Sequence, residues 1–293
     1  MMYWLSYVVI ALILGGLIAA WKTEIYLTQM LVIINLLIFM FVFIPGVRYP
    51  EVTWRVYDEL AGRAIYMQTG ESLHTFLTLM FLHASFMHIA GNILVLFFIG
   101  IALEDRIGKK KTAVAYFLTG IFATTGQYMV NWGSTNLNLG ASGAVMGLMG
   151  VIVYLYPRDK IPMFLGPIFM PQVRVDLAVG VFVAMQTGIA LLNPYSNIAH
   201  AAHIAGFGSG IIIAYFLGKA RTTIQKKKQR DYTKLERLVT GPGLAEIYRK
   251  IIEADNDDVR DAWLEVFYKK AKCPRCKGNM GKERCKCGYD PWG

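Results

Sequence analysis

The stretch Gly140-Ala141-Ser142-Gly143-Ala144-Val145-Met146-Gly147 decides how the rest of this chain is interpreted, because it puts a serine between glycines inside an apolar segment. A second apolar segment carries a histidine in Ala202-His203-Ile204-Ala205-Gly206. Polar side chains at membrane depth are costly and usually functional. A hydroxyl and an imidazole on two apolar segments therefore predict a reactive pair inside a bilayer.

Ser142 taken alone has a simpler explanation, because many serines in membrane helices only bond the backbone of their own helix. The stretch also differs from the G-x-S-x-G turn of soluble hydrolases, since Ala144 stands where the last glycine would be. The interpretation of Ser142 therefore depends on what lies beside it in the fold.

Two pairs of glycines bear on that question. Gly143 and Gly147 have the small-xxx-small spacing that lets two helices approach closely, and Gly206 and Gly210 repeat this spacing. If the two glycine faces pack together, the side chains of Ser142 and His203 come within hydrogen-bonding reach. His200 lies nearer the expected water boundary, where an interfacial histidine in contact with water is the simpler interpretation.

Composition places the chain among membrane proteins with a polar tail. It has 293 residues, of which 55% are hydrophobic, against about 45–50% in soluble domains. From Lys219 onward there are 19 Lys and Arg and 11 Asp and Glu, so the tail carries 19 − 11 = +8 of the net charge of +10. Anionic lipids attract such basic segments to the cytoplasmic face. No nucleic acid is expected, because the tail lacks interleaved aromatic residues and any reader motif.

Seven apolar segments have a length that suits a membrane span, which needs about 20 residues. The first lacks a basic leader and a clean cleavage site, so we interpret it as a retained helix rather than a signal peptide. The seven expected spans cover about residues 3–20, 27–44, 86–103, 112–130, 141–156, 177–192 and 199–217.

Basic residues predict the orientation of these spans. Lys and Arg gather after the third, fifth and seventh spans, at 109–111, 158–160 and 221–228, and such loops stay in the cytoplasm. The N-terminus and the loops 45–85, 131–140 and 193–198 are then expected outside, with 45–77 partly inserted at the interface. Ser142 and His203 both fall near the outer ends of their helices. We expect an integral, multi-pass protein of a prokaryotic cell membrane, with its N-terminus outside and its C-terminal tail in the cytoplasm.

A third motif precedes the third span. The stretch Leu82-His83-Ala84-Ser85-Phe86-Met87-His88-Ile89-Ala90-Gly91-Asn92 puts His88 and Asn92 on one helical face. Side chains of this kind can donate hydrogen bonds to a developing oxyanion. A histidine metal site or polar contacts between helices remain alternatives, although these segments contain no carboxylate that would support a metal.

In this order, H-x4-H-x3-N, G-x-S-G and A-H-x2-G-x3-G resemble the rhomboid family of intramembrane serine proteases, over about residues 27–217. The resemblance implies an all-α membrane fold with a six-helix core, preceded here by one extra helix. It implies Ser142 as nucleophile and His203 as general base, without an aspartate and without a cofactor for catalysis. It further implies an oxyanion hole, a structural histidine and a close helix contact. The oxyanion hole would consist of His88, Asn92 and the Ser142 N–H, and His83 would be the structural histidine. Gly206, with Gly140, Gly143 and Gly210, would allow the close helix contact.

The family likeness has one departure. Many members carry a Trp-Arg pair nine and eight residues before the first motif histidine, where this chain has His74 and Thr75. The Trp54-Arg55 pair lies too far upstream to align, so the outer loop is expected to pack differently.

The tail ends in Cys273-Pro274-Arg275-Cys276 and Cys285-Lys286-Cys287-Gly288, a spacing that predicts four thiolates around one structural zinc ion. Two reduced, unliganded thiol pairs are the alternative. The expected division is 1–26 (extra transmembrane helix), 27–218 (protease core), 219–272 (basic helical linker region) and 273–293 (zinc-ribbon-like unit). A protein partner of the cytoplasmic tail is compatible with this division.

Three functions fit these patterns. The first is an intramembrane endopeptidase that cleaves single-span membrane proteins near the outer face of the bilayer. The second is a catalytically silent relative that binds transmembrane helices. The third is a transporter that uses His83, His88 and His203 as a proton or metal path, and the combined motifs favour the first.

Overall fold

The computed structural model describes residues 2–165, 168–192, 199–218, 231–254, 257–280 and 284–292. The chain forms two compact units, Met1–Thr223 and Ile224–Gly293. The expected outer loop 193–198 and the basic run 226–228 lie outside the described residues. Each unit is built mostly from helices and has its own apolar core.

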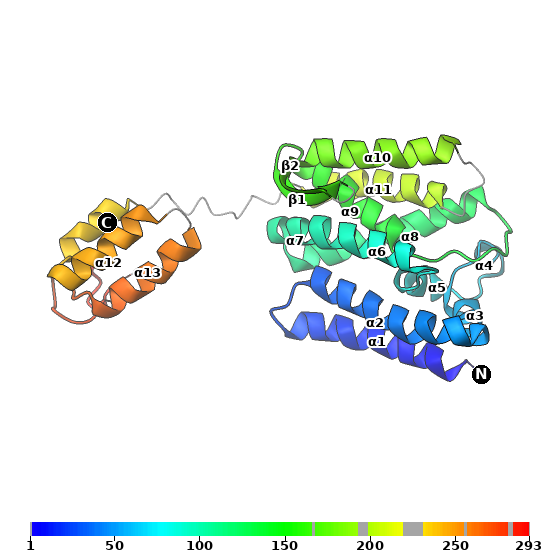
Figure 1. Cartoon of the computed structure of the whole chain (residues 1–293), viewed down its shortest axis with the longest axis horizontal. Coiled ribbons are helices and arrows are strands. Elements are labelled where there is room, and N and C mark those ends of the chain that lie inside the picture. Colours follow the sequence, from blue (N-terminus) through cyan, green and yellow to red (C-terminus); the bar gives the residue numbers. More distant parts are fainter. Residues whose placement is uncertain are drawn as a thin grey trace. The chain divides into compact units, whose positions relative to one another are not determined.

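All seven expected spans are helical in the first unit, and they run along a common direction in Figure 1. The third consists of α6 and α7 joined without a break by one π-helical segment, η2. The helices are α1 (Trp4–Lys22), α2 (Leu27–Arg48), α6 (Phe86–Val95) with η2 (Leu96–Gly100) and α7 (Ile101–Ile107), α8 (Lys109–Val130), α9 (Ser142–Leu155), α10 (Val175–Leu192) and α11 (His200–Leu217).

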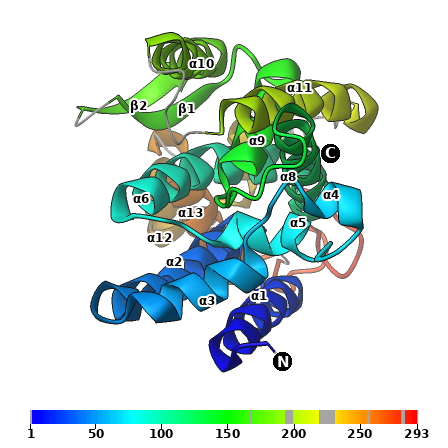
Figure 2. The same cartoon turned by 90° about the vertical axis from the view of Figure 1, so that its right-hand side faces the viewer.

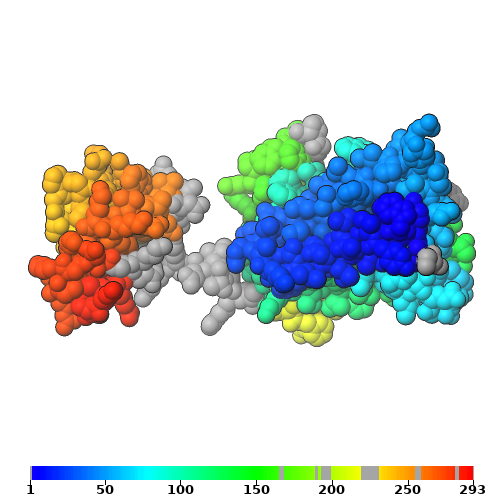
Figure 3. All heavy atoms as spheres, turned by 90° about the horizontal axis from the view of Figure 1, so that it is seen from below, coloured from blue at the N-terminus to red at the C-terminus, as the bar shows by residue number. Residues whose placement is uncertain are grey.

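Four of these helices are long and apolar enough to cross a membrane by length and composition: α1, α2, the α6–α7 helix and α11. Helices α9 and α10 offer shorter apolar stretches, and α8 begins with three lysines. Large apolar side chains point outward from α1 and α2, which cover the face shown in Figure 3 in blue; Leu14 is 56% exposed and Met40 is 55% exposed. An apolar surface this extensive suits contact with lipid rather than water.

Helix α9 packs against both α8 and α11, which also contact each other, and small residues permit these contacts (Figure 2). A Cβ on Gly206 would stand 2.2 Å from the carbonyl oxygen of Gly143, and one on Gly210 would stand 2.1 Å from that of Gly147. On the α8 side, a Cβ on Gly147 would lie 2.1 Å from Thr119. The expected packing of the two glycine faces is therefore present, and it brings two helix backbones into direct contact.

Short helices gather at the end of the first unit where α9 begins, which we call the serine end. The expected outer loop 45–85 contains α3 (Pro50–Leu60), α4 (Tyr66–Thr69), α5 (Thr75–Thr78) and the 3-10 turn η1 (Leu79–Phe81). Helix α3 is amphipathic and buries Val56, Tyr57 and Leu60. A pair of backbone hydrogen bonds between Gly62 and Asn138 ties this region to the segment before α9.

A β-hairpin at the opposite end differs from the expectation of an all-α fold. Strands β1 (Lys160–Leu165) and β2 (Ile168–Arg174) pair antiparallel, with an irregular register between Ile161 and Met163. The sequence hides these strands because Pro162 and Pro171 interrupt them, and proline is poorly compatible with strands except at edges and bulges. Both strands of a two-stranded sheet are edges, so the prolines are tolerated.

A buried carboxylate holds the start of α2. Glu104, which is 4% exposed, accepts hydrogen bonds from the backbone N–H groups of Leu27 (2.8 Å) and Thr28 (2.9 Å) and from the Thr28 hydroxyl (2.8 Å). The first N–H groups of a helix lack partners within the helix, and a negative charge there is favourable. This interaction fixes α2 to α7.

The second unit folds around its own core. Its helices are η3 (Tyr232–Leu238), α12 (Pro242–Glu253) and α13 (Asp257–Lys270), and the cysteines follow α13. The helical periodicity of Leu244, Ile247, Ile251 and Ile252 predicts one apolar stripe. The first three are buried in α12, but Ile252 is 46% exposed. Cys273 and Cys285 belong to the same buried cluster.

The glycine contact between α9 and α11 gives a matched prediction. Gly210→Ala forces a methyl group against the Gly147 carbonyl, so we expect a loss of about 1–3 kcal/mol of stability. Gly208→Ala, on the same helix, meets nothing within 4 Å and should be neutral or stabilising by up to about 1 kcal/mol. The measurement is the midpoint of thermal unfolding in detergent, and equal midpoints for both variants would contradict the close contact.

Candidate active site

Ser142 is the first residue of α9. Gly140, two residues earlier, has φ +127°, a conformation that side-chain-bearing residues rarely adopt. The Gly140 N–H donates to the carbonyl of Leu79 at 2.8 Å, which anchors the turn before the helix. Backbone N–H groups in the first turn of a helix have no acceptor within it, so those around Ser142 are available to an anion.

His203 lies on α11 one turn before Gly206 and is 8% exposed. Its Nδ1 is buried and has no hydrogen-bond partner within the described part of the chain. Gly206 contacts the Gly143 carbonyl directly. Ser142 is the residue before Gly143, and His203 is three residues before Gly206, so both lie beside this helix contact. The structure therefore places the two side chains at the same end of the α9–α11 interface.

His88 and Asn92 share one face of α6. Ser85 caps this helix by accepting a hydrogen bond from the His88 N–H at 3.2 Å, and the Asn92 amide donates to the His88 carbonyl at 2.8 Å. Nε2 of His88 faces the turn before α9, because a Cβ on Gly140 would lie only 2.7 Å from it. The structure thus brings the third motif to the start of the serine helix.

His83 is 2% exposed, and its ring lies 4.9 Å from that of His88, edge to face. Neither ring nitrogen of His83 has a hydrogen-bond partner among the described residues. The side chain is thus a packing group under His88. The ring of His200 lies 6.5 Å from that of His203.

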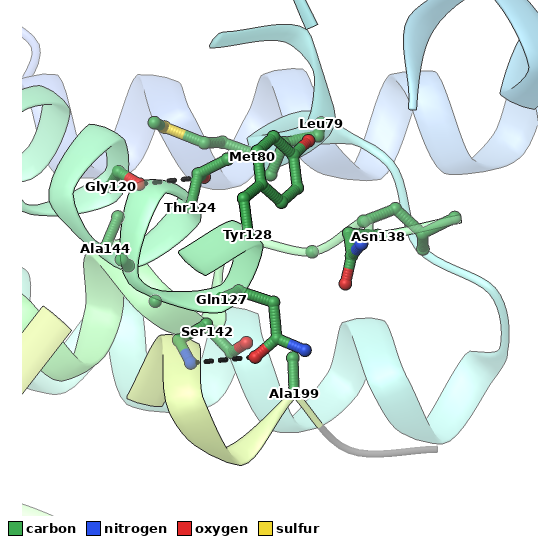
Figure 4. A pocket seen from close by; sticks show the side chains of 15 residues that line it. Leu79, Met80, Gly120, Thr124, Gln127, Tyr128, Asn138, Ser142, Ala144 and Ala199 are labelled. Atoms are coloured by element: carbon green, nitrogen blue, oxygen red, sulfur yellow. Dashed lines mark hydrogen bonds between the residues drawn. The ribbon is translucent and has the colours of Figure 1, made fainter. Parts of the chain in front are cut away.

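A small cavity of about 30 Å³ opens beside Ser142 (Figure 4). Gln127 on α8 lines it, and the side-chain oxygen Oε1 of Gln127 accepts a hydrogen bond from the Ala202 N–H at 3.0 Å. Asn138 lines the same cavity from the segment before α9. Sequence reasoning missed both residues, although a glutamine in an apolar span is itself a signal of function.

The outer loop packs by its own set of bonds where many rhomboid proteases have the Trp-Arg pair. The His74 Nε2 lies 2.9 Å from the carbonyl oxygen of Glu59, and Thr75 is fully buried and donates to the Ser72 carbonyl at 2.7 Å. The His74 contact joins the start of α5 to the end of α3, and the Thr75 contact stays within the loop.

Four cysteine sulfurs converge in the second unit. The Sγ atoms of Cys273, Cys276, Cys285 and Cys287 all lie within 4.8 Å of one another. The sulfurs of Cys276 and Cys285 are 3.4 Å apart and those of Cys273 and Cys287 are 3.6 Å apart, far longer than a disulfide bond of about 2.05 Å. All four cysteines are free. The cluster can hold a metal ion.

Comparison with known proteins identifies the family. Residues 70–220 match the Rhomboid domain, which is just over half of the 293 residues. The chain therefore belongs to the rhomboid family, whose members are embedded in membranes.

Individual proteins with rhomboid names match parts of the chain at 28% sequence identity. The chain is 28% identical over 180 residues to YdcA of Bacillus subtilis (strain 168), which carries a provisional rhomboid-protease name; the match covers 61% of this chain and 80% of YdcA. It is 28% identical over 144 residues to RHOMBOID-like protein 1 of Arabidopsis thaliana, covering 47% of this chain and 33% of that protein. It is 28% identical over 142 residues to rhomboid protease GluP of Bacillus subtilis, covering 48% of this chain and 25% of GluP. The last two matches thus span a third or less of the relatives' length.

The contact between Gly140 and His88 is testable. Gly140→Ala combines a disfavoured backbone conformation with a methyl group placed on the His88 ring, so we expect a loss of about 1–3 kcal/mol. Gly70→Ala has a positive φ of 69°, in the left-handed region, but open space around its Cβ, so it reports a strained backbone without a clash, about 1–2 kcal/mol. Thermal unfolding in detergent should show the larger loss for Gly140→Ala; the reverse order would argue against the His88 contact.

Proposed function

We propose that this chain is an intramembrane serine endopeptidase in which Ser142 is the nucleophile and His203 the general base. The observation that carries the proposal is the direct backbone contact of Gly206 with Gly143, which Ser142 and His203 flank. In this proposal the protease core covers 27–218 as six transmembrane helices, and α1 is an additional helix.

The chemistry follows from what each group can do. Serine is a weak nucleophile until a base removes its proton, and burial of His203 favours the uncharged ring that can accept it. Attack on the scissile carbonyl breaks its π bond and forms a tetrahedral intermediate with a negative oxygen. His203 then gives the proton to the leaving amine, and water releases the acyl group from Ser142.

The oxyanion has three proposed donors. They are the Nε2–H of His88, the side-chain amide of Asn92 and the backbone N–H of Ser142. His88 Nε2 faces the turn that leads into Ser142, and the N–H groups of the first turn of α9 lack partners within the helix. Donors already in place stabilise the developing charge without reorganisation, by a few kcal/mol each.

The expected substrate is a single-span membrane protein cut near the outer face. Basic residues at 109–111 and 158–160 lie at the end of the helix bundle opposite the serine end, and such residues favour the cytoplasmic side of a membrane. The serine end then meets the outer aqueous phase, which supplies the hydrolytic water. A peptide bond is attacked only when its own helix is locally unwound, so glycine, proline or small residues near the outer end of the substrate helix are favoured.

Replacing the nucleophile tests the proposal. Ser142→Ala should reduce cleavage of a single-span substrate in liposomes to background, because it removes the hydroxyl that forms the proposed acyl intermediate. Ser209→Ala is the matched control, since the Ser209 hydroxyl donates to the Gly206 carbonyl of its own helix at 2.9 Å. The wild type and Ser209→Ala should be labelled by a fluorophosphonate, and Ser142→Ala and His203→Ala should not.

Full cleavage by Ser142→Ala would refute the proposal. Absence of both cleavage and labelling in folded wild-type protein would favour a silent relative that binds transmembrane helices.

For the second unit we propose a structural zinc site. A tetrahedral zinc with Zn–S bonds of about 2.3 Å separates its sulfurs by about 3.8 Å, and the cysteine Sγ atoms lie within 4.8 Å of one another. Cys273 and Cys285 are buried in the core of the unit, so the ion would join the two cysteine pairs into that core. With four protein ligands no position is left for a substrate, so the ion would supply folding free energy rather than catalysis.

Metal analysis checks this site. The purified full chain should contain one zinc per chain by mass spectrometry of the elements, and Cys276→Ser should lower this content because a ligand is lost. The control Ser142→Ala should keep its zinc. Four thiols that react freely without releasing metal would show that the cysteines are unliganded.

A further inference from the structure

Helix α3 is attached to the start of α1 through Glu59. The Glu59 carboxylate accepts the backbone N–H of Tyr3 at 2.8 Å and 3.0 Å, one distance for each oxygen. The N–H groups at the start of a helix have no partner within it, and a carboxylate there satisfies them and favours the helix dipole. The additional helix α1 is therefore fixed to α3 at the serine end.

Tyr57 projects from another side of the same helix, because two residues of an α-helix are about 200° apart around its axis. It is 8% exposed, and its hydroxyl donates to the carbonyl oxygen of His83 at 2.6 Å. Burial raises the pKa of Tyr57 to about 12. The hydroxyl therefore keeps its proton at neutral pH and remains a donor.

The peptide group that Tyr57 contacts also reaches the ring of His88. The carbonyl of His83 and the N–H of Ala84 belong to one peptide bond, and that N–H donates to Nδ1 of His88 at 3.5 Å. Such chains of hydrogen bonds polarise one another, so a donor on the carbonyl strengthens the N–H at the other end of the peptide. With Nδ1 accepting, the proton of the neutral ring sits on Nε2, the nitrogen that faces Gly140.

We propose that Tyr57 is a positioning residue: through the His83–Ala84 peptide it holds His88 with its Nε2–H directed at the turn before Ser142. Glu59 supports this arrangement by fixing α1 to α3. The inference rests on the proposed function, because it assigns His88 as an oxyanion donor. It gives the additional helix a role at the site although α1 contributes no side chain to the catalytic groups.

Tyr57→Phe removes the hydroxyl and little else. We expect kcat per active site to fall about 10-fold with KM unchanged, less than the loss of about 100-fold or more that follows deletion of an oxyanion donor itself. The concentration of active sites is determined by fluorophosphonate labelling, and the cleavage rate is divided by it. Unfolded protein therefore does not affect the value of kcat. Tyr116→Phe is the matched control, since Tyr116 is fully buried and its hydroxyl has no hydrogen-bond partner within the described residues; its kcat should equal that of the wild type.

A second pair of variants tests the link to α1. Glu59→Gln weakens the acceptor for the Tyr3 N–H, and we expect a fall in kcat of about 2- to 5-fold. Glu51→Gln, on the exposed face of the same helix, should leave kcat unchanged.

The outcomes separate the two proposals. An unchanged kcat per active site in Tyr57→Phe, with cleavage by the wild type that depends on Ser142, overturns the role of Tyr57 and leaves the protease proposal standing. A rise in KM with unchanged kcat also overturns it, since that would place Tyr57 in substrate binding. Wild-type cleavage that persists in Ser142→Ala refutes the protease proposal itself.

Discussion

The rest of the first unit depends on the contact between the backbones of α9 and α11. Gly206 and Gly210 meet the carbonyl oxygens of Gly143 and Gly147 at distances that no side chain could occupy. In lipid there is no hydrophobic force between helices, so close van der Waals packing of small residues supplies the association. A side chain of α9 at the end of this contact is consequently held at a fixed position relative to the facing side chain of α11. The proposed pair of Ser142 and His203 needs such a fixed position.

Polar groups concentrate where that contact meets the serine end. The start of α9 leaves backbone N–H groups without partners, and α6 brings His88 to the preceding turn through a serine cap. Side-chain hydrogen bonds from α3 and α5 then fix the loops around this turn. An apolar bundle can carry such a cluster because it lies where helix ends and loops offer hydrogen-bond partners. The ring nitrogens of His83 and the Nδ1 of His203 are the exceptions, since they have no partner among the described residues.

Much of this architecture was predictable from local pattern. Apolar length predicted all seven helices, and the motif spacing predicted which faces of α6, α9 and α11 carry His88, Ser142 and His203. The hairpin after α9 was missed because proline residues in its strands oppose the local preference for β structure. Gln127 was missed because its partner, the Ala202 N–H, lies 75 residues away along the chain, and sequence order does not reveal such contacts.

The amino-acid sequence by itself determined the membrane class, the helices, the glycine faces and the convergent cysteine spacing, because each depends on residues close together in the chain. Only the tertiary structure decided that Glu104 caps α2, that Glu59 holds the start of α1 and that the Tyr57 hydroxyl reaches the His83 carbonyl. These contacts join segments 26 to 77 residues apart. They exist because a buried backbone group must find a partner wherever the packing of helices places one.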